Sequence, residues 1–103
     1  MIKLSVMYPK SEGMKFDMDY YRNTHIAMVL DKCGDAIKSC SVEQCLGGAA
    51  GGASAPYLVI ARLDVESMDD FEKYVAPHDP EFSADVPNFT NIRPIIQLDE
   101  VVI

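Results

Sequence analysis

The sequence has no tryptophan, only two histidines and three cysteines, and few basic residues. Nine Lys and Arg stand against sixteen Asp and Glu, which gives a formal net charge of −7. This charge repels phosphate backbones and anionic lipid headgroups, so we expect no nucleic-acid partner and no membrane partner. No uninterrupted apolar run approaches the roughly 18 residues that cross a bilayer. The first residues also lack the apolar core of a signal peptide, so we expect a cytoplasmic protein.

The cysteines argue against a disulfide scaffold. Cys33, Cys40 and Cys45 are odd in number, and none of them forms a CxxC pair or belongs to a zinc-type spacing. His78 and Glu81 make a His-x-x-Glu pair, but two or three ligands from one segment make a weak site. We therefore predict reduced thiols and no metal site.

The chain has enough material for one domain, residues 1–103, and 49% of its residues are hydrophobic. Residues 2–8 alternate between apolar and polar side chains, which predicts a half-buried strand. Further strands are predicted at residues 36–46, 57–65 and 92–102. The Gly- and Ala-rich stretch 47–56 lacks the lysine of a phosphate-binding loop and reads as a hairpin connection.

Two helices complete the pattern. The first is predicted from Asp17, whose side chain can cap a helix N-terminus, to Gly34, which suits a helix C-terminus. The second begins after Ser67 and is predicted to end by residue 75 or 76, because a residue before Pro77 resists the helical region. Residues 78–90 are then expected to be irregular.

The resulting order is β-α-β-β-α-β. Short connections and right-handed crossovers leave one common α+β solution, the ferredoxin-like fold, with a four-stranded antiparallel sheet and both helices on one face. Residues 57–65 and 92–102 carry apolar side chains on both faces. We therefore expect a homodimer that pairs sheet to sheet through the open face into an α/β barrel.

Three segments carry a resemblance to a known family. Residues 2–9 together with the pattern Phe-Asp-x-x-Tyr-Tyr-x-x-x-His at 16–25 resemble the opening of EthD-type proteins of the dimeric α/β-barrel superfamily. Residues 77–94 resemble that family's closing segment. The resemblance implies a ferredoxin-like protomer that dimerises through its sheet. It also implies a role near the degradation of ethers and other small organic compounds, among relatives that include cofactor-free isomerases, cyclases, monooxygenases and haem-handling enzymes.

His25 is the leading candidate for chemistry. It lies in the middle of the apolar stripe of the first helix, and imidazole exchanges protons near neutral pH. The alternative is a core histidine that binds a backbone carbonyl or Asp85. Tyr20 and Tyr21 point about a hundred degrees apart, so only one faces the pocket. We choose Tyr21, four residues before His25, as a second catalytic residue that donates to substrate oxygen.

Five further residues form the predicted substrate-binding set. Asp85 and Asn88 flank Pro87, and Asp85 can orient His25, although both residue types also suit turns. His78 follows the second helix and either binds substrate or satisfies the helix dipole. Tyr57 and Arg62 lie in the third strand, where Arg62 either binds an anionic substrate or pairs with an acidic neighbour.

The residues and the resemblance together favour a cofactor-independent enzyme of the isomerase, lactone-handling or oxygenase type. It would act on a small, largely apolar compound between sheet and helices, with His25 as general base. The alternatives are a non-catalytic dimeric carrier for a small hydrophobic molecule, a haem-binding protein with His25 as axial ligand, or an assembly element in a larger complex.

Overall fold

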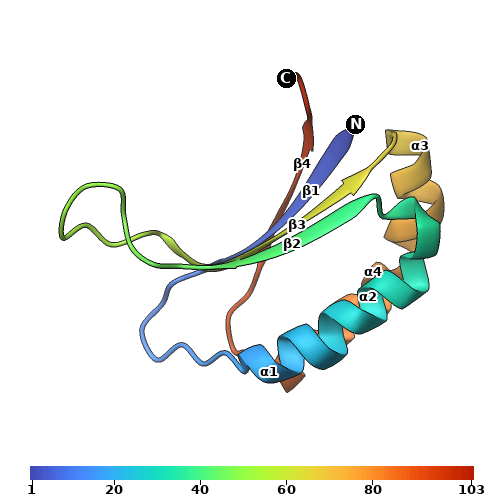
Figure 1. Cartoon of the computed structure of the whole chain (residues 1–103). Coiled ribbons are helices and arrows are strands. Elements are labelled where there is room, and N and C mark those ends of the chain that lie inside the picture. The colour runs from blue at the N-terminus through green and yellow to red at the C-terminus, as the bar shows by residue number, and fades with distance from the viewer.

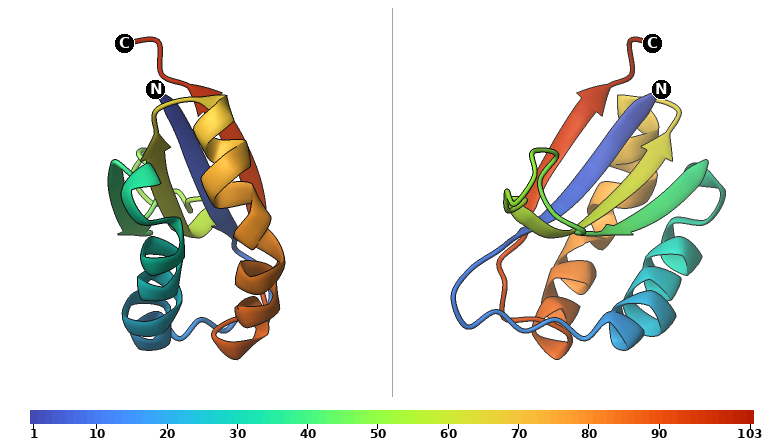
Figure 2. Two further views of the ribbon diagram at one scale, coloured as in Figure 1. Left: turned by 90° about the vertical axis from the view of Figure 1, so that its right-hand side faces the viewer. Right: turned by 60° about the vertical axis from the view of Figure 1, so that its left-hand side comes forward.

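The computed structural model describes all residues, 1–103, and contains one antiparallel sheet in the order β2-β3-β1-β4. The strands are β1 (Ile2–Pro9), β2 (Ser39–Gln44), β3 (Tyr57–Val65) and β4 (Ile95–Glu100). Both helical runs cover the same face of this sheet (Figures 1 and 2). The predicted α+β, ferredoxin-like fold is therefore confirmed.

The first helical run has the predicted ends. It consists of α1 (Met18–Tyr20), η1 (Tyr21–His25), α2 (Ile26–Cys33) and the short turn η2 (Gly34–Ala36). The Asp17 side chain caps it by accepting a hydrogen bond of 3.0 Å from the backbone N–H of Tyr20. At the other end Gly34 has a φ of 57°, a conformation that glycine adopts without strain. Within the run, η1 is a wide π turn in which the N–H of Ile26 binds the carbonyl of Tyr21.

The second helical run is longer than predicted. It consists of α3 (Met68–Asp70), η3 (Phe71–Val75), η4 (Ala76–His78), α4 (Asp79–Asp85) and η5 (Val86–Asn88). The expectation that residues 78–90 are irregular is therefore wrong. Pro77 and Pro80 stand in the first positions of η4 and α4, where a helix needs no backbone donor. The prolines therefore redirect the helical run and do not end it.

The two sides of the sheet differ in polarity. The register places Leu4 opposite Leu63 and Leu98, so these side chains share the helix-covered face. The other face carries polar residues on every strand, with apolar ones at one end. Its side chains are Lys3, Ser5, Met7, Ser39, Ser41, Glu43, Leu58, Ile60, Arg62, Asp64, Ile95, Gln97 and Asp99. The expected second apolar face is thus wrong in its extent, because the expectation used only the third and fourth strands.

Exposed apolar surface gathers instead on β4 and the residues after it. Ile95 and Ile96 are about half exposed, and Val102 and Ile103 are almost fully exposed. β4 is an edge strand, and it is shorter than the predicted 92–102 because Pro94 precedes it. The strand predicted at 36–46 is likewise shorter, since residues 34–36 form η2.

The core between sheet and helices has two parts. The aliphatic end comprises Leu4, Val29, Cys33, Leu63, Val65 and Val75. The aromatic end comprises Tyr8, Tyr21, Val59, Ala61, Phe89 and Ile92, with Phe16 packed against it. At the aromatic end, Thr90 ties the closing segment to the opening loop: its Oγ1 donates to the carbonyl of Lys15 at 2.6 Å. The first and last motifs of the sequence therefore meet in space.

Candidate functional site

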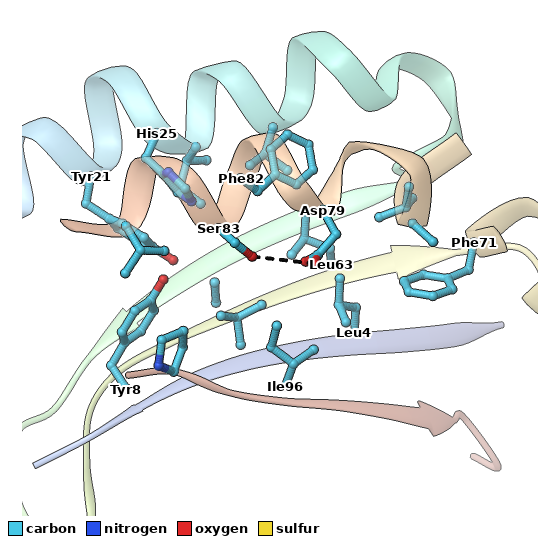
Figure 3. Close-up of a pocket in the computed structure, with 18 residues that line it drawn as sticks. Leu4, Tyr8, Tyr21, His25, Leu63, Phe71, Asp79, Phe82, Ser83 and Ile96 are labelled. Carbon is cyan, nitrogen blue, oxygen red and sulfur yellow. Dashed lines mark hydrogen bonds between the residues drawn. The ribbon is translucent and has the colours of Figure 1, made fainter. Parts of the chain in front are cut away.

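A cavity of about 110 Å³ lies between the sheet and the two helical runs (Figure 3). Most of its lining is apolar, and its polar side chains are His25, the Tyr8 and Tyr21 hydroxyls, Asp79 and Ser83. The lining residues are Leu4, Val6, Tyr8, Tyr21, His25, Ile26, Val29, Ala61, Leu63, Phe71, Val75, Ala76, Asp79, Phe82, Ser83, Val86, Pro94 and Ile96. An apolar cavity of about 150 Å³ is known to hold benzene, so the cavity suits a molecule of roughly one ring.

His25 forms a charge-assisted pair with Asp85. Its Nδ1 lies 2.8 Å from the Asp85 carboxylate, although 60 residues separate them along the chain. The imidazole is 6% exposed, stacks on Tyr21 at 5.5 Å and lies 4.6 Å from the Phe89 ring. Stacking and the Asp85 bond together fix the orientation of the ring.

Asp85 is the centre of a hydrogen-bond network. Its second carboxylate oxygen accepts from the Tyr20 hydroxyl at 2.7 Å and from the Asn88 side-chain amide at 2.9 Å. Burial acts to raise the pKa of Asp85, but the hydrogen bonds from Asn88, Tyr20 and His25 outweigh it and lower the pKa. We call Asp85, His25, Tyr20 and Asn88 the Asp85 network.

The ionised carboxylate decides where the proton of neutral His25 resides. A carboxylate only accepts hydrogen bonds, so Nδ1 of His25 carries the hydrogen and donates it to Asp85. The Nε2 atom of His25 then keeps its lone pair, because the hydrogen bond of this ring within the protein uses Nδ1. The site therefore holds an imidazole that can accept a proton at Nε2.

Two buried tyrosines lie beside this imidazole. The hydroxyls of Tyr8 and Tyr21 point toward one another (Figure 3), and their ring centroids are 5.7 Å apart. Burial raises the pKa of Tyr8 to about 12, and a hydrogen bond from Tyr21 offsets part of that rise. Burial also raises the pKa of Tyr21. Both hydroxyls stay protonated at neutral pH.

No protein-family model and no curated protein sequence matches the chain. A solved structure does: an EthD-like protein from Ralstonia eutropha JMP134 is 36% identical, with a TM-score of 0.89. That match covers 99% of this chain and 92% of the other. The chain belongs to the EthD-like family.

More distant structures share the fold of this EthD-like protein. An ethyl tert-butyl ether D (EthD) family protein from Bacillus halodurans C-125 is 17% identical, covers 98% of this chain and 99% of its own, and has a TM-score of 0.66. A dimeric ferredoxin-like protein of unknown function from Thermobifida fusca YX is 15% identical, covers 97% and 90%, and has a TM-score of 0.58. These two structures support the fold, and the family rests on the Ralstonia eutropha match.

Not all residues of the predicted site meet in this EthD-like protein. His25, Tyr21 and Asp85 lie together, and Asn88 joins them through Asp85. His78 does not line the cavity; its ring packs against Phe82 at 5.9 Å.

The two predicted residues of β3 also lie elsewhere. Arg62 points to the open face of the sheet and forms an ion pair with Glu43 at 3.1 Å. Tyr57 lines a separate hollow beside Leu58 and Ile60. Neither residue reaches the cavity that contains His25.

Sequence reasoning missed four residues of the site. Tyr8 ends the alternating pattern that predicts the first strand, and this pattern gives Tyr8 no role in the site, although its hydroxyl faces the cavity. The sequence favours Tyr21 over Tyr20, since only one of the two can face the pocket, yet the Tyr20 hydroxyl binds Asp85. Asp79 and Ser83 fell in the segment predicted to be irregular. A helical reading of that segment places them one turn apart, on the same face.

Cofactor ligands are scarce around the cavity. No three His, Cys, Asp or Glu side chains lie close enough together to hold a metal ion. His25 alone could ligate haem iron through Nε2, but a cavity of about 110 Å³ is too small for a tetrapyrrole. The haem alternative stays a prediction that the cavity's size does not support.

No helix has the length and apolarity that crossing a bilayer requires.

Proposed function

We propose that this EthD-like protein is a cofactor-independent enzyme that moves a proton on a small, largely apolar organic compound, with His25 as general base. One observation carries the proposal: the His25 imidazole lines an apolar cavity, and its Nδ1 atom forms a 2.8 Å hydrogen bond with Asp85. A base oriented by a carboxylate is the arrangement that general-base catalysis needs.

The first chemical step follows from these positions. Nε2 of His25 takes a proton from an acidic carbon next to a carbonyl group, and the electron pair of the broken C–H bond moves to the carbonyl oxygen. The ionised Asp85 stabilises the imidazolium that forms. Return of the proton to another carbon gives an isomer, and lactone chemistry or oxygenation begins with the same anion.

The developing oxyanion needs a donor, and Tyr8 supports this role better than Tyr21. We assign the hydrogen between the two hydroxyls to Tyr21, because Tyr21 acts to lower the pKa of Tyr8, and this assignment leaves the hydrogen of Tyr8 for a ligand oxygen. The pKa of about 12 keeps that hydrogen in place at neutral pH. Tyr21 then acts through Tyr8 and through its stacking on His25.

We also propose that the protein works as a cytoplasmic homodimer. The Thermobifida fusca neighbour is described as dimeric, and the exposed apolar side chains of β4 and the C-terminal residues need cover in this chain. All three cysteines are free thiols, which fits a reducing compartment. Sedimentation at micromolar concentration tests the dimer, and a monomer under those conditions contradicts it.

Deuterium exchange tests the proton transfer without knowledge of the natural substrate. The protein is incubated in D₂O with a panel of single-ring cyclic and aryl ketones, and NMR measures loss of the α-hydrogen. We expect faster exchange than in buffer for at least one ketone. His25→Asn keeps a side-chain N–H near the Nδ1 position for Asp85 but removes the base, so exchange should fall by roughly 100-fold or more.

Asp19→Asn is the matched control, because Asp19 lies on the same helical run, exposed and paired with Arg22. Its exchange rate should equal that of the wild type. If ketones bind but none exchanges above the buffer rate, the carrier alternative replaces the enzyme. Unchanged exchange in a folded His25→Asn protein would remove His25 as the base.

A further inference from the structure

Asp79 and Ser83 are cavity-lining polar residues that the proposed proton transfer does not use. They lie one turn apart on α4, and the Ser83 hydroxyl donates to the Asp79 carboxylate at a long 3.5 Å. Figure 3 shows both side chains directed from α4 toward the cavity, between His25 at one end and Phe71 at the other. Both residues are exposed, so they line the cavity where it opens to solvent, and a ligand that reaches this opening meets them as well as the buried His25.

The charge of the lining is one-sided. No Lys or Arg lines the cavity, and Asp79 is its only carboxylate. The whole chain also has a formal net charge of −7, which repels anions. An anionic ligand would lose its hydration against apolar walls, find no Lys or Arg in the lining and be repelled by Asp79.

The hydrogen-bonding groups on this wall are acceptors. The Asp79 carboxylate accepts only, and the Ser83 hydroxyl already directs its hydrogen to Asp79, which leaves its oxygen to accept. A hydroxyl group on the ligand supplies the missing donor. The size of the cavity adds the last constraint on the ligand, because a volume of about 110 Å³ holds roughly one ring.

We infer that the cavity selects an uncharged single-ring compound with a hydroxyl group, that Asp79 and Ser83 bind this hydroxyl, and that Asp79 rejects carboxylates of the same size. The inference rests on the proposed function only in taking this cavity as the substrate site. It adds the chemical class of the substrate and makes Asp79 a specificity-determining residue.

Two matched pairs of probes test the inference by binding alone. Phenol has a hydroxyl where toluene has a methyl group, and benzoate has a charged carboxylate where benzamide has a neutral amide. Each is titrated while NMR follows the methyl signals of Leu4, Val29 and Leu63, which line the cavity. We expect phenol to bind about tenfold more tightly than toluene, as one hydrogen bond to a carboxylate allows. Benzoate should bind at least about tenfold more weakly than benzamide.

Variants of Asp79 locate the cause. Asp79→Leu removes the acceptor, so phenol should lose its advantage over toluene. Asp79→Asn removes the charge but keeps a carbonyl acceptor, so the gap between benzamide and benzoate should narrow by at least threefold while phenol keeps most of its advantage. Asp69→Asn changes the same charge at an exposed position outside the cavity and should leave both ratios unchanged.

Three results would overturn the inference: benzoate binding as tightly as benzamide, an unchanged phenol advantage in folded Asp79→Leu, or no methyl shift with any probe. The outcome of the deuterium-exchange experiment is independent of these binding results. The expected binding ratios without exchange would remove the proposed enzyme and leave the ligand class standing. Deuterium exchange together with reversed binding ratios would support the proposed enzyme and remove the inferred ligand class.

Discussion

The two ends of the core are packed with different side chains. The aliphatic end, around Leu63 and Val65, consists of Leu and Val side chains with the Cys33 thiol among them, and its contacts are those of hydrophobic packing. At the aromatic end, Tyr21 stacks on the His25 imidazole, Phe89 lies tilted against it, and His25 belongs to the Asp85 network. Both ends lie on the same sheet and under the same two helical runs.

Because of this difference, one end of the core mainly stabilises the fold, and the other end positions the residues of the candidate site. Hydrocarbon packing is strong but has no preferred orientation, so it stabilises the domain without positioning a polar atom. Aromatic contacts and charge-assisted hydrogen bonds are directional, so they hold the His25 ring in the orientation that proton transfer needs. Substitutions at the aliphatic end should therefore lower stability most, and substitutions at the aromatic end should change the state of His25.

Leu63→Ala breaks the aliphatic end and should have the largest effect on stability. Leu63 is 3% exposed, and truncation leaves a hole that its rigid neighbours cannot fill. We expect the free energy of unfolding to fall by about 3 kcal/mol, measured by urea titration. Leu30→Ala, on the exposed side of α2, should cost less than about 1 kcal/mol. Equal losses for the two variants would contradict the packing of the aliphatic end.

Thr90→Val breaks the link between the closing segment and the opening loop at the aromatic end. The Thr90 hydroxyl accepts from the backbone N–H of Ile92 at 3.0 Å and donates to the carbonyl of Lys15 at 2.6 Å. Valine leaves both backbone groups without this partner, so stability should fall by about 2 kcal/mol. Thr24→Val, an exposed substitution on the first helical run, should be nearly neutral by the same urea titration. A neutral Thr90→Val would contradict the buried link.

Asp85→Asn sharpens the comparison because its effect is on His25 more than on stability. The Asn carbonyl still accepts from Tyr20 and Asn88, so the loss should be about 1 kcal/mol. Its amide, however, donates to Nδ1 of His25 and moves the imidazole hydrogen to Nε2. Nitrogen-15 NMR of the His25 ring above pH 8 should show this exchange of tautomers. The Asp19→Asn protein should keep the wild-type tautomer, and an unchanged tautomer in Asp85→Asn would refute the assignment.

The sequence was sufficient to predict the order of elements and the helix-covered face. The alternation of β1 and the caps at Asp17 and Gly34 are local signals, and the structure confirms them. The helical segment 79–88 was missed because Pro77 and Pro80 are read locally as terminators. Whether a proline ends or begins a turn depends on the tertiary packing that follows it.

The site was only half visible from the sequence. His25 and Tyr21 share a helix, so spacing alone places them together. The bond from His25 to Asp85 crosses 60 residues and was an alternative among others. Tyr8 and Tyr20 acquire their roles only through partners on other elements, and no local pattern marks such residues.

The pH dependence of stability isolates the charge at the aromatic end. Hydrogen bonds lower the pKa of folded Asp85 below the value of about 3.9 that an unfolded aspartate has. The stabilisation from this carboxylate is therefore fully present above that value and is lost as pH falls through the folded pKa. Asp64, on the open face, has a pKa lowered chiefly by Ser39 and acts in the same direction, so wild-type stability alone does not separate the two.

The difference between wild type and Asp85→Asn does separate them, because Asp64 is common to both proteins. We expect this difference in the free energy of unfolding to shrink as the pH falls from 5 to 2.5, where Asp85 takes up a proton. Urea titrations at each pH measure it. A gap that stays constant down to pH 2.5 would mean that Asp85 is not held as a carboxylate by its three partners. His25 would then lack the fixed Nδ1 hydrogen on which its role as a base depends.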